Sequence, residues 1–116
     1  MALHGRSSSH FTRLTRIFAF EADVPLAFHP VADLGGLDVD AYGGHPALKI
    51  PLLRMGDEAI FGSENICRRL ASAATNHLNV AWTEQLRWVE LRNAQELIWQ
   101  AMAAQTQLVF GLQLAG

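Results

Sequence analysis

The chain has 116 residues, of which half are hydrophobic and 17% are charged, and its formal net charge at pH 7 is −2. At this length one folded domain is the usual expectation, and the composition argues against intrinsic disorder. The nine lysines and arginines are scattered along the chain, so nothing favours nucleic-acid binding. The single cysteine, Cys67, excludes an internal disulfide framework and a Cys-x-x-Cys redox pair.

Neither a metal site nor a membrane anchor is expected. The five histidines lack the paired spacing and the acidic companions of metal ligands. Residues 97–116 carry no charge over about the length of a membrane span, but their four glutamines would be costly in hydrocarbon. No apolar segment of signal-peptide length precedes Arg6, so a cytoplasmic location is expected.

The first thirty residues predict a strand, a helix and a second strand. Residues 3–4 fit only a short strand. A helix is expected over His10–Ala22, with Ser9 as its N-cap, because its apolar residues recur at steps of three and four. These apolar residues are Phe11, Leu14, Ile17 and Phe18. Residues 26–31 predict a strand that has Pro30 at its end.

The middle of the chain predicts a loop, a hairpin and a helix. Residues 32–46 are rich in glycine and aspartate and predict a loop with a short irregular helix. Two apolar runs, 50–55 and 59–61, are separated by a tight polar turn and predict an antiparallel hairpin. Ser63 is expected to cap a helix that runs to about Ala74. The apolar face of that helix comprises Ile66, Leu70 and Ala74.

A linker and a long helix complete the chain. The linker is expected over residues 76–82, and Thr83 opens a helix of about 28 residues, roughly 40 Å long. The order of elements is β-α-β, loop, β-β-α and long helix, in which the first two strands are parallel and the last two antiparallel. We therefore predict a thioredoxin-like α/β domain over residues 1–75, followed by a separate helical part over residues 83–116.

Three positions in this layout carry chemistry. A cis Ile50-Pro51 bond would leave the backbone of Ile50 free to pair with a peptide ligand, whereas a trans bond would only start an edge strand. Ser63 at a helix start is either a structural cap or a carboxylate site, because helix N-termini are partly positive. Ser9 is likewise either a cap or a hydroxyl that donates a hydrogen bond to a thiolate.

The segments around these positions resemble the glutathione transferase family. Residues 9–17 are similar to the start of that family's first helix. The segment His-Pro-Ala-Leu-Lys-Ile-Pro-Leu-Leu at residues 45–53 is similar to its Asn-Pro-x-Gly-Lys-Val-Pro-x-Leu segment. Phe-Gly-Ser-Glu-Asn-Ile-Cys-Arg-Arg-Leu at residues 61–70 is similar to its Leu-x-Glu-Ser-x-Ala-Ile-x-x-Tyr-Leu segment. The resemblance covers residues 2–75 and, less specifically, residues 83–116 as the first helix of the family's all-helical second domain.

The resemblance implies that the chain binds glutathione as a co-substrate and conjugates its thiol to an electrophilic small molecule. Ser9 falls where serine-type members activate the thiol and where cysteine-type members form a mixed disulfide. Ile50 would hold the cysteinyl backbone of glutathione ahead of a cis Pro51. Ser63 would bind the γ-glutamyl carboxylate, and Lys49 would bind the glycyl end.

Two departures from the family pattern concern the first turn of the helix that Ser63 opens. Gly62 stands where an acidic or amide residue usually precedes the serine, so one partner for the ammonium group of the ligand is missing. Glu64 is the nearest carboxylate and is included among the candidate binding residues, although on a helix it would point elsewhere. Asn65 replaces a small apolar residue.

The last helix is expected to need partners on two sides. One apolar stripe is Leu86, Leu97 and Leu108, and another is Trp88, Trp99 and Phe110. The two stripes lie on nearly opposite sides of a helix, and the α/β domain can cover only one of them. The further helices of the family do not follow, so either the sequence is truncated or a second copy supplies the cover. We predict a homodimer.

The sequence therefore leaves two functions open. The first is a glutathione transferase that acts in detoxification, with Ser7 and Ser8 as alternatives to Ser9 for the catalytic hydroxyl. The second is a non-catalytic binding or regulatory module of the same fold, which Gly62 and the missing electrophile pocket favour. A dithiol oxidoreductase is the poorest hypothesis, because Ser-His-Phe-Thr at residues 9–12 stands where its cysteines would be.

Overall fold

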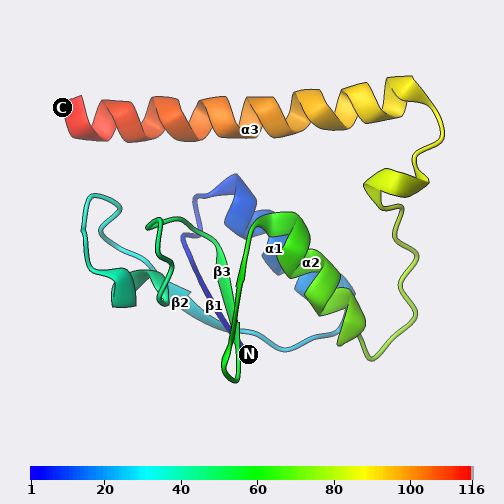
Figure 1. Cartoon of the computed structure of the whole chain (residues 1–116), viewed down its shortest axis with the longest axis horizontal. Helices are drawn as coiled ribbons and strands as arrows, with labels where there is room; N and C mark the ends of the chain where they lie inside the picture. Colours follow the sequence, from blue (N-terminus) through cyan, green and yellow to red (C-terminus); the bar gives the residue numbers. More distant parts are fainter. Residues whose placement is uncertain (116) are drawn as a thin grey trace. The chain divides into compact units, whose positions relative to one another are not determined.

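The chain folds into two compact units, which meet in sequence between Leu78 and Asn79 (Figure 1). The computed structural model describes residues 1–115, with side chains as far as residue 112. The first unit contains the sheet and two helices, and the second contains one long helix.

A four-stranded mixed sheet forms the centre of the first unit. Its strands are β1 (Ala2–Gly5), β2 (Ala27–Pro30), β3 (Leu52–Met55) and β4 (Glu58–Phe61). They lie in the order β2-β1-β3-β4, in which β1 and β2 are parallel and the other pairs antiparallel. This confirms the predicted thioredoxin-like α/β fold. Strand β3 begins two residues later than predicted, because proline has no N–H to donate to the ladder.

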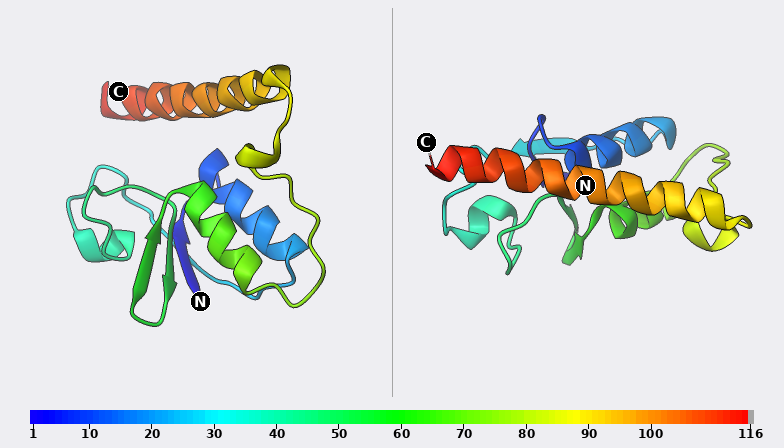
Figure 2. Two further views of the ribbon diagram at one scale, coloured as in Figure 1. Left: turned by 45° about the vertical axis from the view of Figure 1, so that its right-hand side comes forward. Right: turned by 90° about the horizontal axis from the view of Figure 1, so that it is seen from above.

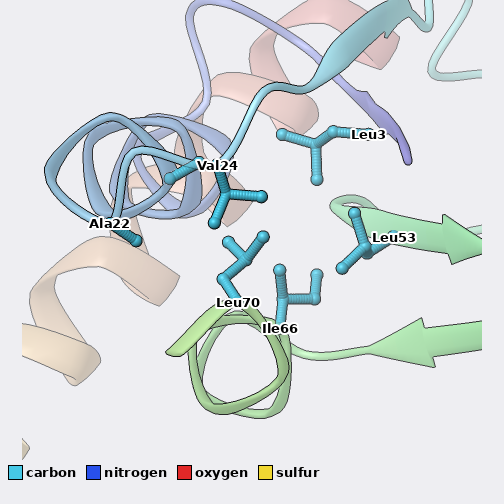
Figure 3. Close-up of a cluster of buried hydrophobic side chains, with 7 residues drawn as sticks. Leu3, Ala22, Val24, Leu53, Ile66 and Leu70 are labelled. Carbon is cyan, nitrogen blue, oxygen red and sulfur yellow. The ribbon is translucent and has the colours of Figure 1, made fainter. Parts of the chain in front are cut away.

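The alternation of side chains along the strands defines the core of this unit. Leu3 and Leu53 are fully buried on the face that packs against α1 (His10–Glu21) and α2 (Ser63–Ser72). The buried side chains labelled around them in Figure 3 are Ala22, Val24, Ile66 and Leu70. Burying one aliphatic side chain of this size stabilises a fold by about 1.5–3 kcal/mol, so this cluster joins the two helices to the sheet.

The buried face of α1 differs from the predicted one. Thr12 and Thr15 are fully buried, whereas Leu14 is 36% exposed and Ile17 is 62% exposed. The expectation that Leu14 and Ile17 face the core is therefore wrong. The threonines can be buried because their hydroxyls are satisfied: Thr12 Oγ1 accepts the Arg6 N–H at 3.2 Å, and Thr15 Oγ1 donates to the Thr12 carbonyl at 2.8 Å.

The connection from β2 to β3 covers the opposite face of the sheet (Figure 2). It contains the short helix η1 (Val39–Tyr42), in agreement with the loop and irregular helix that we predict there. Arg54 Nε donates to the Gly43 carbonyl at 3.0 Å. A Cβ added at Gly43 would lie 2.6 Å from the His4 side chain, so the connection approaches the sheet closely at this glycine.

Helix α2 presents the predicted apolar face to the core. Ile66 and Leu70 are fully buried, and the helix ends at Ser72, two residues before the predicted end. Cys67 is buried as well, and this burial, followed by the charge of Glu64, raises the pKa of its thiol to about 11. Cys67 therefore behaves as a small hydrophobic residue.

The second unit begins with the short helix η2 (Thr83–Gln85) and continues as α3 (Val89–Ala115). The prediction of one helix opening at Thr83 is therefore wrong. Leu86 has an extended backbone with ψ of 108°, which ends η2 and separates it from α3. As a result, Leu86 and Trp88, the first members of the two apolar stripes, lie outside α3.

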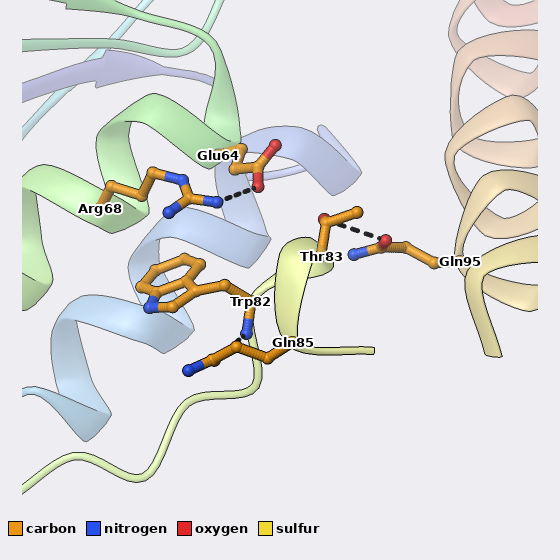
Figure 4. Close-up of polar contacts among 6 residues, drawn as sticks. All are labelled: Glu64, Arg68, Trp82, Thr83, Gln85 and Gln95. Carbon is orange, nitrogen blue, oxygen red and sulfur yellow. Dashed lines mark hydrogen bonds and ion pairs between the residues drawn. The ribbon is translucent and has the colours of Figure 1, made fainter. Parts of the chain in front are cut away.

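Side-chain hydrogen bonds accompany this interruption (Figure 4). The Trp82 backbone N–H donates to Gln85 Oε1 at 2.8 Å, and the Thr83 hydroxyl donates to Gln95 Oε1 at 3.1 Å. These bonds within the second unit favour a separate turn over a continuous helix. Within residues 1–115, no helix has the length and hydropathy that crossing a bilayer requires.

Candidate functional site

The strand register brings the three predicted segments to one end of the sheet. His4 pairs with Leu52, and Leu52 pairs with Phe61, so these residues form one row across β1, β3 and β4. The loop after β1, the segment before β3 and the start of α2 therefore all leave the sheet at this row. The predicted residues on these segments are Ser9, Lys49, Ile50, Pro51 and Ser63.

The Ile50-Pro51 peptide bond is cis, as predicted. Pro51 is buried, Ile50 is half-buried, and Lys49 is exposed. The registered pairs between β1 and β3 end at Leu52, so the backbone of Ile50 lies just beyond the ladder.

Ser9 is the N-cap of α1, which confirms the structural part of its prediction. Its Oγ accepts the Thr12 N–H at 3.3 Å, and its own backbone N–H donates to the Arg6 carbonyl at 3.0 Å. The cap uses Ser9 Oγ only as an acceptor, so its O–H hydrogen can be donated to another group. Ser9 is half-buried, whereas Ser7 and Ser8 are exposed. Of the three serines, Ser9 is the one whose hydroxyl caps α1.

Ser63 is buried and does not cap α2 with its hydroxyl, so that prediction is wrong. The N-cap is Gly62, which has φ of 85° and no side chain, and Ser63 is the first helical residue. Ser63 Oγ instead donates to the Phe11 carbonyl at 3.3 Å. This bond joins the start of α2 to the first turn of α1, two residues from Ser9. It places the two predicted serines on neighbouring helix ends.

Glu64 is directed along the surface of α2. Its Oε1 pairs with Arg68 Nη2 at 3.0 Å, one turn further along the helix (Figure 4). Asn65 Nδ2 donates to the Phe61 carbonyl at 3.0 Å and so ties the start of α2 to β4. An exposed pair such as Glu64–Arg68 contributes about 0.3–0.5 kcal/mol and opens readily.

The sequence interpretation missed His45, which is only 8% exposed. Its Nδ1 accepts the Ala47 N–H at 3.1 Å, and its ring packs on Phe61 with 4.3 Å between ring centroids. Burial lowers the pKa of His45, and the charge of Lys49 lowers it further. A sequence signal exists: the His45 side chain can accept the N–H of the residue two positions later, as aspartate and asparagine do in an Asx turn.

A pair of histidines lies under the β2–β3 connection. The His4 and His29 rings are 4.9 Å apart between centroids. Burial is the largest cause that lowers the pKa of His4, followed by His29 and Arg54. Among residues 1–115, no three His, Cys, Asp or Glu side chains are grouped so that they could hold a metal ion.

Comparisons with known proteins show the family of the first unit and proteins of similar fold. Residues 3–78 match the family described as glutathione S-transferase, N-terminal domain. Glutathione transferase F2 from Populus trichocarpa has a similar fold, with a TM-score of 0.57 and 23% identity over 63% of this chain. A glutathione S-transferase domain-containing protein from Marinobacter aquaeolei VT8 has a TM-score of 0.61 and 18% identity over 80% of this chain.

Because both sequence identities are low, the two solved structures support only the fold of the chain. The chain spans 35% of the length of the Populus protein and 45% of the length of the Marinobacter protein. No curated protein is significantly similar to it in sequence.

Proposed function

Because the chain belongs to the glutathione S-transferase family, we propose that it binds glutathione and that Ser9 polarises the thiol of this tripeptide for conjugation to an electrophile. One observation carries the proposal. Ser9, the cis Ile50-Pro51 segment and Ser63 leave adjacent strands at the same end of the sheet. A tripeptide with a thiol needs a hydrogen-bond donor for its sulfur, a free backbone edge for its peptide groups and a helix N-terminus for a carboxylate. These three segments offer such groups.

The proposed chemistry follows from the way in which Ser9 is held. The oxygen caps α1 and leaves its hydrogen to donate to the glutathione sulfur, while the N-terminus of α1 adds partial positive charge. Lowering a thiol pKa by about two units needs roughly 2.7 kcal/mol, which one such donor and a helix end can supply together. The thiol proton passes to solvent, and the thiolate sulfur forms a bond to the electrophilic carbon. With a chloronitrobenzene the carbon–chlorine bond then breaks, and chloride leaves with the bonding electron pair.

The remaining residues supply binding in this proposal. The Ile50 backbone pairs with the cysteinyl unit, and Lys49 attracts the glycyl carboxylate. The start of α2 receives the γ-glutamyl carboxylate through N–H groups of its first turn and through the Ser63 hydroxyl, which must first release the Phe11 carbonyl. Glu64 offers a carboxylate to the ligand ammonium once its exposed pair with Arg68 opens.

Calorimetric titration with glutathione, followed by a chloronitrobenzene conjugation assay, tests the proposal. We expect binding at millimolar concentration or tighter. Ser9→Ala should lower the conjugation rate about tenfold or more, because a hydrogen bond to a charged group contributes about 1.5–3 kcal/mol. Ser8→Ala is the matched control and should keep the wild-type rate, since that side chain is exposed. Equal rates in wild type and Ser9→Ala would remove Ser9 from the mechanism.

A binding or regulatory module of the same family is the second candidate. Gly62 brings no acidic side chain to the site, and Glu64 is engaged with Arg68. For such a module we expect glutathione binding in the titration together with background conjugation in every variant. The two measurements therefore separate the candidates.

We also propose that the protein acts in the cytoplasm as a homodimer that associates through α3. Leu97 is 66% exposed and Leu108 is 63% exposed, and both lie on the same side of α3. Leu97→Glu combined with Leu108→Glu should shift the sedimentation coefficient from dimer to monomer. The control is Gln105→Glu combined with Gln107→Glu, which adds the same charge at exposed polar positions of α3 and should leave the dimer intact. A wild-type monomer at micromolar concentration would contradict the proposal.

A further inference from the structure

His45 closes the turn that leads into the cis-proline segment. Its Nδ1 accepts the Ala47 N–H at 3.1 Å, and its carbonyl accepts the Leu48 N–H at 3.1 Å. Leu48 has φ of 53°, a left-handed conformation that costs a residue with a Cβ about 1–2 kcal/mol. The two hydrogen bonds of His45 offset this cost and fix the direction in which the chain enters Lys49.

The same imidazole contacts the other half of the proposed site. Its ring lies on Phe61 with an interplanar angle of 32°. Phe61 is the last residue of β4 and directly precedes Gly62 and Ser63. His45 therefore links the segment proposed to bind the cysteinyl and glycyl units to the segment proposed to bind the γ-glutamyl unit.

We propose that His45 is a positioning residue that holds the Lys49–Pro51 segment in its binding conformation only while its ring is neutral, so that pH regulates glutathione binding. The inference rests on the proposed function. Accepting the Ala47 N–H requires a lone pair on Nδ1, and a protonated imidazole has none because both nitrogens carry hydrogen. Protonation would also place a cation in a buried position.

The surroundings of His45 set the direction of the effect. Among the described residues, Lys49 is the charged group that acts on His45, and Phe61, which packs on the ring from β4, is uncharged. Burial and Lys49 together lower the pKa of His45 below its usual 6.5, so the folded chain favours the neutral ring. Neutral His45 therefore stabilises the Lys49–Pro51 segment fully above pH 6.5, and this stabilisation is lost as the pH falls through the lowered pKa.

Titration with a glutathione analogue at pH 7 and pH 5 tests the inference. The probe is S-methylglutathione, which has no thiol to ionise, because the proposed function brings the pKa of the bound thiol into this window. Its carboxyl groups titrate near about 3.5 and its amine near about 8, so its charge stays nearly constant. We expect the Kd of the wild type to rise as the pH falls through the lowered pKa of His45, and to reach about threefold to tenfold above its value at pH 7 once the ring is protonated, as for the loss of one hydrogen bond.

Two variants separate positioning from general stability. His45→Asn keeps an acceptor at the same bonded position and cannot be protonated, so its affinity should equal that of the wild type at pH 7 and stay constant at pH 5. His45→Leu has no acceptor and should bind weakly at both values. His77→Asn removes an exposed histidine of another segment and should retain the wild-type pH dependence. The same pH dependence in wild type and His45→Asn would overturn the inference.

A measurement without ligand keeps the two proposals distinguishable. The Ala47 amide resonance of the free protein should shift with pH in step with the His45 ring protons, and it should stay constant in His45→Asn. If glutathione binds no variant, the proposed function fails while this titration still decides the role of His45. If the chemical shift of the Ala47 amide in the wild type did not change as His45 ionises, the inference would be wrong.

Discussion

Replacing Leu70 with alanine is expected to lower the free energy of unfolding of the first unit by about 2–5 kcal/mol. Leu70 is fully buried in the cluster that joins α2 to the sheet and to the end of α1. The substitution removes the apolar surface of three carbons and leaves a cavity that Ile66 and Val24 cannot fill without moving (Figure 3). Urea unfolding followed by far-ultraviolet circular dichroism measures the change.

Ile17→Ala is the matched control for Leu70→Ala. Both positions lie on helices of the first unit, but Ile17 is 62% exposed, so its truncation should change stability by no more than about 0.5 kcal/mol. Comparable losses from the two variants would show that the exposed face of α1 contributes as much as the core does.

Replacing Gly5 with alanine is expected to cost about 1–3 kcal/mol of stability and to weaken glutathione binding as well. A Cβ at this position would lie 2.6 Å from both Thr12 Cγ2 and Thr12 Oγ1. Thr12 is fully buried and β-branched, so it cannot rotate away. Relieving the clash between the new Cβ and Thr12 therefore requires a shift of α1. Ser9, the N-cap of that helix, would move with it. Urea unfolding and glutathione titration measure the two effects.

A double variant tests this explanation of Gly5→Ala. Thr12→Ser removes Cγ2 and frees the remaining hydroxyl to rotate, so it should restore part of the stability that Gly5→Ala loses. Gly111→Ala is a control on an exposed part of α3, where an added Cβ meets nothing within 4 Å. It should stabilise the helix by up to about 1 kcal/mol. Additive losses from the two substitutions at Gly5 and Thr12 would contradict the proposed contact.

The sequence predicted the parts of the fold that depend on local pattern. The order of strands and helices, the Ser9 cap and the cis bond at Pro51 each follow from a motif whose residues are adjacent in the chain. The hydroxyl of Ser63 could not be assigned in this way. Its partner is the Phe11 carbonyl, 52 residues away, and only the packed helices bring the two groups together.

The core face of α1 shows a second reason for error. Periodicity selects Leu14 and Ile17 because they are apolar, but it cannot register that two threonines satisfy their hydroxyls locally and so become the buried residues. The role of His45 was not predicted from the sequence for a related reason. Its role depends on the ring of Phe61, which β4 supplies from another part of the sheet.

The central place of β1 in the sheet has a consequence for the chain as it is being synthesised. Leu3 pairs with Leu53, so β1 acquires its second neighbour only after roughly fifty further residues have been added. At about 5–20 residues per second this takes several seconds, during which one edge of β1 and the apolar face of Leu3 stay open to other chains. Translation speed and the capacity of chaperones should therefore influence the yield of folded protein.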